Sequence, residues 1–99
     1  MPIGKEIDEI GCNLLIKRGY RKNILHRTGH SIGFHSPHGK HGHLSLKNEE
    51  PILINMGYTI EPGVYLKGEF GVRSEINFFI NEYRQLVLTI PVQRELVRI

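Results

Sequence analysis

The sequence has little of several features that mark specialised classes of protein. It contains one cysteine, Cys12, so no disulfide can form within the chain, and a reducing cytoplasm is the simplest compartment. No stretch approaches the ~20 apolar residues of a membrane span, and Met1 is followed by Pro2 and Gly4 rather than by the apolar run of a signal peptide. No block of consecutive Lys or Arg concentrates the formal net charge of +3. We therefore expect no membrane association and no nucleic acid binding, which needs a basic stripe with interleaved aromatic side chains.

The composition is otherwise that of an ordinary globular protein. The hydrophobic share of 39% and the charged share of 23% lie near the usual values, which argues against disorder. A chain of 99 residues is one small domain or a piece of a larger one. No internal repeat or low-complexity segment interrupts it. We expect the chain to fold, given its partners, around a modest core.

The first part of the chain has the spacing of a helix. Its apolar residues recur at intervals of four, three and four, at Ile3, Ile7, Ile10 and Leu14. This spacing predicts a helix over residues 3–18 with those side chains on one face. Gly19 can take the left-handed conformation that closes a helix, so we expect the helix to end there.

The rest of the chain changes character in two steps. Residues 20–48 hold all six histidines and no clean period, which indicates short strands joined by loops. Later, β-branched and aromatic runs bounded by Gly, Pro, Asn and Glu predict strands at 52–55, 58–61, 64–66, 72–80 and 86–90. One helix followed by closely spaced strands is typical of the α+β class with a mostly antiparallel sheet.

Three short segments end or centre on a candidate metal ligand. They are His-Arg-Thr-Gly-His at 26–30, Thr-Ile-Glu-Pro-Gly at 59–63 and Gly-Val-Arg-Ser-Glu at 71–75. Two carboxylates and an imidazole suit Mn, Co, Zn or Fe ions. Spacing alone leaves a second interpretation open, in which the carboxylates are solvated surface groups and the histidines are ordinary loop residues.

Alternation along a strand groups the polar side chains of two of these segments. Thr59 and Glu61 share one face, and Pro62 stops the strand directly after the carboxylate. Arg73 and Glu75 likewise share a face. That pair therefore faces either water or a polar cavity.

Together and in this order, the three segments resemble the metallopeptidase family that includes aminopeptidase P, prolidase and methionine aminopeptidase. The resemblance is closest to the proline-specific branch and runs from about Gly4 to Leu88. It implies a partial pita-bread (creatinase/aminopeptidase) fold of the α+β class, with residues 1–99 as the carboxyl-terminal part of a peptidase catalytic domain. It also implies an Xaa-Pro aminopeptidase or dipeptidase that uses two divalent ions, manganese among the candidates, and a peptide substrate with proline after its amino-terminal residue.

The resemblance assigns a role to each matching position. His30 and Glu61 match ligands of one metal, and Glu75 matches the carboxylate that bridges both metals. Glu61 also lies near enough to accept or relay a proton in catalysis. His26 matches a histidine that positions the substrate and the developing oxyanion. Arg73 matches an arginine that holds the ligand carboxylates in place.

One catalytic histidine of the family does not fall in register. The family has it seven residues after the ligand histidine, where this chain has Pro37. A one-residue insertion would restore the register, so we assign the role to His38, with His35 as the competitor. His41 and His43 lie beyond the resemblance, and we expect ordinary loop histidines.

The larger departure from the family concerns two aspartate ligands. In the family they lie upstream of the helix, whereas Asp8, the only aspartate here, lies inside it. We expect Asp8 to be a solvent-facing helix residue. We also expect the isolated chain to bind divalent ions weakly and not to hydrolyse peptides without the missing upstream half of the domain. A sheet face that this half would cover favours self-association, as a homodimer for example.

Two other functions stay open on the sequence alone. One is a non-catalytic relative that binds peptides or proteins through the same fold. The other is a metal-sequestering loop built from the histidines at 35, 38, 41 and 43.

Overall fold

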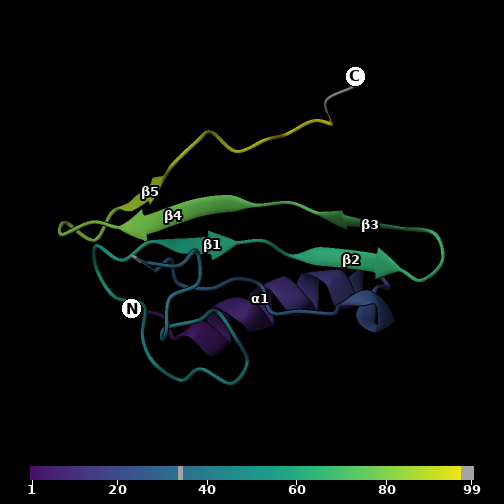
Figure 1. Cartoon of the computed structure of the whole chain (residues 1–99), viewed down its shortest axis with the longest axis horizontal. Helices are drawn as coiled ribbons and strands as arrows, with labels where there is room; N and C mark the ends of the chain where they lie inside the picture. Colours follow the sequence, from purple (N-terminus) through teal and green to yellow (C-terminus); the bar gives the residue numbers. More distant parts are fainter. Residues whose placement is uncertain (34, 97–99) are drawn as a thin grey trace.

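A single helix lies along one side of a long, bent β-hairpin in the computed structural model, which describes residues 1–33 and 35–96 (Figure 1). The elements are α1 (Gly4–Lys17), the 3-10 turn η1 (Arg21–Asn23), β1 (Tyr58–Ile60), β2 (Gly63–Leu66), β3 (Phe70–Arg73), β4 (Ile76–Ile80) and β5 (Leu86–Leu88). None of the described helices is long and apolar enough to cross a membrane. The predicted helix and most of the predicted strands are confirmed, with bounds shifted by one or two residues.

The ends of α1 are held by backbone groups. Gly4 N–H donates to the Glu50 carbonyl at 3.0 Å, and Lys5 N–H donates to the Asn48 carbonyl at 2.7 Å, so a distant loop caps the amino end. At the other end Gly19 has a φ of 93°, which is the left-handed conformation expected there.

The face that α1 turns inward differs from the predicted one. Ile7 packs against the core, but Ile10 is 71% exposed and Leu14 is 57% exposed. The prediction that Asp8 faces solvent is wrong, because the residue is only 3% exposed. It accepts hydrogen bonds from Thr28 N–H at 2.9 Å, the Thr28 hydroxyl at 2.7 Å and Leu46 N–H at 2.9 Å. These donors compensate for the loss of water around a buried carboxylate.

Two antiparallel sheets follow the helix. The order of the first is β1-β4-β5, with Tyr58 opposite Phe78, and the second is the β2-β3 pair, with Gly63 opposite Arg73. The predicted strand 72–80 is therefore two strands, because the chain breaks its pairing at residues 74–75 opposite the interruption at 61–62. The two sheets form one continuous bent ribbon (Figure 1).

The predicted strand at 52–55 is wrong. Residues 54–55 form a turn, and Asn55 has a φ of 62°, a left-handed conformation that a strand does not contain. Ile52 is still buried, which explains the apolar signal at this point of the sequence. Burial of a side chain there does not require a strand.

The segment 28–32 lies along β1 and adds to its hydrogen-bonded ladder. Thr59 N–H donates to the His30 carbonyl at 2.8 Å, and Glu61 N–H donates to the Thr28 carbonyl at 2.6 Å. Gly29 is needed here because a Cβ at that position would collide with the Thr59 carbonyl. Within the described part of residues 20–48, the predicted short strands appear only as isolated bridges, such as Gly29 with Leu44.

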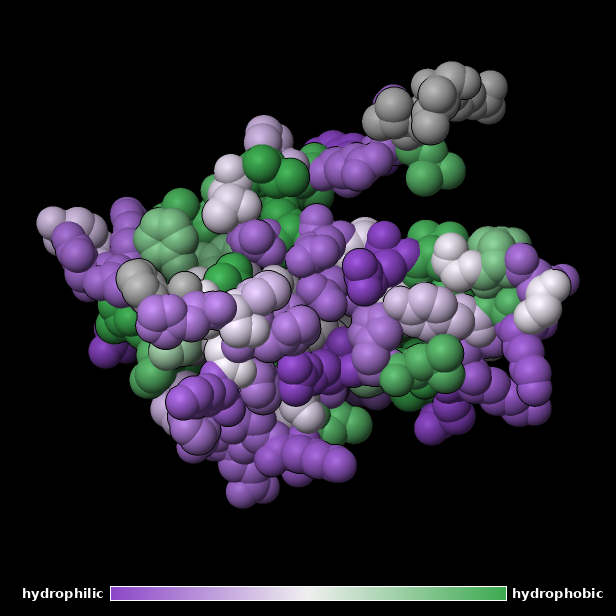
Figure 2. Space-filling model, viewed as in Figure 1, coloured by the Kyte–Doolittle hydropathy of each residue, from purple (hydrophilic) through white to green (hydrophobic). Residues whose placement is uncertain are grey.

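The core is small and lies where helix, loop and sheet meet. Its buried residues are Leu44, Ile52, Tyr58 and Phe78, with Ile7, Met56, Ile60 and Ile80 packed against them. The rings of Tyr58 and Phe78 stack with centroids 5.4 Å apart. Other apolar side chains stay at the surface, and Figure 2 shows some of them over the β2-β3 end of the molecule. The largest exposed one on β3 is Phe70, at 62%.

Candidate metal centre

The two predicted ligands of one metal lie side by side. Nε2 of His30 is 3.5 Å from Oε2 of Glu61, and His30 is only 6% exposed. The pairing of segment 28–32 with β1 brings these residues together. Thr59 fixes the His30 backbone, since its hydroxyl accepts from His30 N–H at 3.0 Å.

The hydrogen bonds of the His30 ring decide which nitrogen can bind a metal. Nδ1 lies 2.7 Å from the Ser31 carbonyl oxygen, which can only accept, so Nδ1 carries the proton and donates. Nε2 faces the Glu61 carboxylate, and in the neutral form of the ring its lone pair points there and can bind a metal ion. A histidine held in this way by its other nitrogen is typical of metal ligands.

The geometry of this pair fits one divalent ion. Two acceptors that face each other repel, and a cation between them removes the repulsion. Ligand bonds of about 2.0 to 2.2 Å place two ligands of one ion about 3 to 3.5 Å apart, and the observed separation is 3.5 Å. Across the described part of the chain, however, no three or more His, Cys, Asp or Glu side chains are close enough to hold a metal together. The pair by itself is therefore not a complete metal site, and Glu75 does not join it in a group of three ligands.

All the predicted site residues line two adjoining cavities. One, of about 310 Å³, is lined by His30, Ile32, Pro37, His38, Thr59, Glu61, Arg73, Glu75 and Asn77. The other, of about 460 Å³, is lined by His26, Arg27, Gly29, His30, His38, Glu61 and Arg73. Arg73 and Glu75 therefore face a polar cavity, which was one of the two predicted alternatives, although both are exposed at its rim.

The two competing loop histidines lie differently. The ring of His38 lies over that of His30, with centroids 4.2 Å apart and a tilt of 36°. His35 is exposed and lines neither of these two cavities. The arrangement is the one expected if His38, rather than His35, belongs to the site.

Sequence reasoning missed Tyr65, which holds the ring of His26. Nδ1 of His26 donates to the Arg27 carbonyl at 2.8 Å, and the Tyr65 hydroxyl donates to Nε2 at 2.7 Å. Strand alternation could have pointed to Tyr65, because it shares a face with Gly63 of the second motif. The same alternation extends the face of Arg73 and Glu75 to Asn77, which also lines the smaller cavity.

Residues 2–82 match the sequence pattern described as Metallopeptidase family M24. The chain belongs to this family. Membership in M24 implies divalent metal ions as cofactors. The observed helix and antiparallel sheets thus form part of the α+β pita-bread fold, as the resemblance implied.

The chain is similar to known peptidases both in sequence and in structure. An uncharacterised peptidase of Staphylococcus aureus strain USA300 is 34% identical over 85 residues, which are 86% of this chain and 24% of the relative. The prolidase of Pyrococcus horikoshii OT3 superposes with a TM-score of 0.84 at 30% identity, over 97% of this chain and 27% of its own. The X-Pro aminopeptidase of Thermotoga maritima MSB8 superposes with a TM-score of 0.82 at 30% identity. This match covers 95% of this chain and 26% of the aminopeptidase. The chain spans about a quarter of the length of these relatives.

Proposed function

We propose that residues 1–99 are the carboxyl-terminal part of the catalytic domain of an Xaa-Pro aminopeptidase or dipeptidase with a dinuclear metal site. The observation that carries the proposal is the pair of His30 Nε2 and Glu61 Oε2 at 3.5 Å, beside a cavity that Glu75 also lines. The solved relatives named as a prolidase and an X-Pro aminopeptidase support the substrate class. The substrate would be a peptide with proline after its first residue.

Each residue has a part in the proposed hydrolysis. His30 and Glu61 would hold one ion, and Glu75 would hold both, with manganese the first to test. The bound ions would lower the pKa of the attacking water and polarise the scissile carbonyl. Glu61 would accept a proton from this water and return it to the proline nitrogen as the peptide C–N bond breaks.

The remaining side chains would orient the reacting groups. His26 and His38 would donate to the carbonyl oxygen as its negative charge develops. Arg73, which lines both cavities, would hold the carboxylates of Glu61 and Glu75 in place.

The proposal includes the upstream half of the domain as an obligatory partner. The chain spans about a quarter of its relatives, and the family's two aspartate ligands would come from that half. We expect the isolated chain to bind ions weakly and to leave Xaa-Pro dipeptides uncleaved. A cytoplasmic location, suggested by the single Cys12, belongs to the same proposal.

Calorimetric titration of the purified chain with Mn²⁺ or Zn²⁺ tests the metal centre. We expect weak, saturable binding that is lost in His30→Gln and in Glu61→Gln. The doubly substituted His41→Gln/His43→Gln variant is the control and should bind normally. Binding that persists when the histidines at 35, 38, 41 and 43 are all replaced would exclude the His-rich loop as the sequestering site. Absence of binding even when the upstream half is supplied would favour a non-catalytic binding module.

Peptidase assays complete the test. Cleavage of an Xaa-Pro dipeptide by the 99-residue chain alone, abolished in Glu75→Ala, would overturn the requirement for the upstream half.

A further inference from the structure

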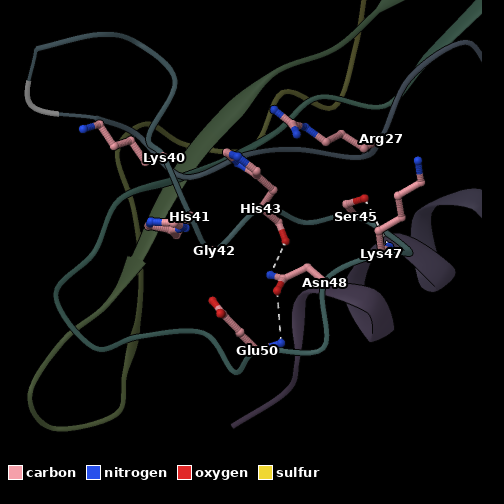
Figure 3. A pocket seen from close by; sticks show the side chains of 9 residues that line it. All are labelled: Arg27, Lys40, His41, Gly42, His43, Ser45, Lys47, Asn48 and Glu50. Carbon is pink, nitrogen blue, oxygen red and sulfur yellow. Dashed lines mark hydrogen bonds between the residues drawn. The ribbon is translucent and has the colours of Figure 1, made fainter.

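A third cavity, of about 310 Å³, lies between the loop at 40–50 and Arg27, a residue that also lines the larger cavity of the metal centre (Figure 3). It is lined by Arg27, Lys40, His41, Gly42, His43, Ser45, Lys47, Asn48 and Glu50. Figure 3 shows the guanidinium of Arg27 and the ring of His43 turned toward each other at one rim. The peptidase mechanism uses none of these side chains.

The lining carries unbalanced positive charge. Arg27, Lys40 and Lys47 contribute three positive charges and Glu50 one negative charge, which leaves a net +2 with neutral histidines. In the described part of the chain the only carboxylate within 4.0 Å of a basic nitrogen is Glu61 beside His30, so none of the three cations has a carboxylate at salt-bridge distance. Unpaired cations around a concave surface attract anions.

His43 is affected first by burial and then by the positive charge around it. Burial of its ring, and then the positive charge of Arg27 and of the His30, His38 and His41 rings when these are protonated, lower the pKa of His43 below the ordinary value for histidine. Its Nδ1 is buried and has no hydrogen-bond partner. The net positive charge of this cavity disfavours a metal cation, which argues against a metal-sequestering role for His41 and His43.

The cavity wall is held in one shape by hydrogen bonds of the loop. The Asn48 side chain donates to the His43 carbonyl at 2.6 Å and accepts from Glu50 N–H at 3.0 Å. Leu44 exchanges two backbone hydrogen bonds with Gly29, which anchors the loop beside the segment that carries Arg27. A preformed wall spares a ligand the entropic cost of ordering the loop.

We propose that this cavity binds a phosphate group, either as free inorganic phosphate or as a phosphate monoester. The net charge of +2 matches a dianion rather than a single carboxylate, and a phosphate monoester carries about −1.5 to −2 at pH 7. Arg27 offers a planar donor fork suited to phosphate oxygens, and Lys40 and Lys47 offer point charges. The cavity size is at the lower end of ligand pockets, about 300 Å³ and above. The inference does not depend on the proposed peptidase function.

Amide NMR titration of the full chain with inorganic phosphate at pH 7.5 tests the proposal. We expect saturable shifts confined to residues 27 and 40–50, and binding about tenfold weaker in Lys40→Gln/Lys47→Gln. The matched control is Lys22→Gln/Lys67→Gln, which removes the same charge from exposed lysines outside the cavity and should bind normally. Arg27→Lys, which keeps the charge but loses the fork, should also weaken binding.

Titrations with O-phosphoserine and with succinate distinguish a phosphate monoester from free phosphate, and phosphate from a carboxylate. Tighter binding of O-phosphoserine than of inorganic phosphate would assign the site to a monoester, and the reverse order to the free ion. Equal binding of succinate and phosphate would overturn the preference for phosphate. Shifts that never saturate, or that both double variants weaken equally, would show general charge attraction and would overturn the site itself.

Discussion

The Tyr65 hydroxyl lies 2.7 Å from Nε2 of His26, and it joins β2 to a motif that is 39 residues away in the sequence. Their rings meet edge to face with centroids 5.4 Å apart. Since Nδ1 of the same imidazole donates to the Arg27 carbonyl, both ring nitrogens are engaged and the ring has one orientation. His26 is thereby held in a fixed tautomer at the rim of the proposed site.

Tyr65→Phe should release this ring while leaving the fold intact. We expect a loss of about 1 kcal/mol in the free energy of unfolding, because one partly buried hydrogen bond disappears. The ring nitrogens of His26, followed by ¹⁵N NMR, should change from one tautomer to a mixture. Tyr83→Phe, at an exposed turn, should change neither quantity. A single unchanged tautomer in Tyr65→Phe would show that the Arg27 carbonyl alone fixes the ring.

Asp8→Ala should destabilise the protein by about 3 kcal/mol or more, because buried donors of Thr28 and Leu46 lose their acceptor. Denaturation by urea, followed by circular dichroism, measures the change. Glu6→Ala, at an exposed position of the same helix, should cost less than about 0.5 kcal/mol. Similar costs for the two variants would refute the anchoring role of Asp8.

The Cys12 thiol should react slowly with iodoacetamide up to high pH. Burial raises its pKa to about 11, helped by its hydrogen bond to Asp8 and by the negative charge of that carboxylate. An alkylation rate with a midpoint near pH 11, rather than near pH 9, is the expected result. Asp8→Asn should lower the midpoint.

The raised pKa of Cys12 also determines how the stability of the protein changes at alkaline pH. The unfolded thiol loses its proton near pH 9, whereas the folded thiol keeps it until about pH 11. The folded state therefore binds more protons in this window, and the Cys12 contribution to stability is lost as the pH rises through it. Cys12→Ser should flatten that part of the pH profile; an unaltered slope would assign the decline to other groups.

The apolar surface between α1 and the β2-β3 pair should cause concentration-dependent association. It lines a cavity of about 370 Å³, and Phe70 and Val72 at its edge are 62% and 57% exposed. We expect Phe70→Ser/Val72→Thr to shift sedimentation toward the monomer, because less apolar area leaves water on contact. Tyr83→Ser, an exposed aromatic in the turn before β5, serves as the control. Association that the two variants reduce equally would place the contact elsewhere.

Much of the fold followed from local patterns in the sequence. The helix and its end at Gly19 were predictable because apolar spacing and a glycine stop signal act within a few residues. The strand predicted at 52–55 failed because Ile52 is buried in a loop, and a short apolar run does not distinguish the two cases. The break at 74–75 lacked a Gly or Pro signal and depends on the partner strand.

The helix face illustrates how tertiary contacts override periodicity. Spacing assigned Ile10 and Leu14 inward and Asp8 outward, yet Ile10 and Leu14 are exposed and Asp8 is buried. A carboxylate is stable inside only when donors from elsewhere reach it, and Thr28 and Leu46 are such donors. No pattern within the helix could have revealed them.

The sequence by itself determined which residues could bind a metal and in what order they occur along the chain, because residue type and strand alternation are local properties. The tertiary structure decided which of them meet. His30 lies beside Glu61 because the Thr59 and Glu61 amides donate to the carbonyls of residues 28–30. Register between separate segments is set by hydrogen bonds and packing across the whole fold, and no window of sequence contains that information.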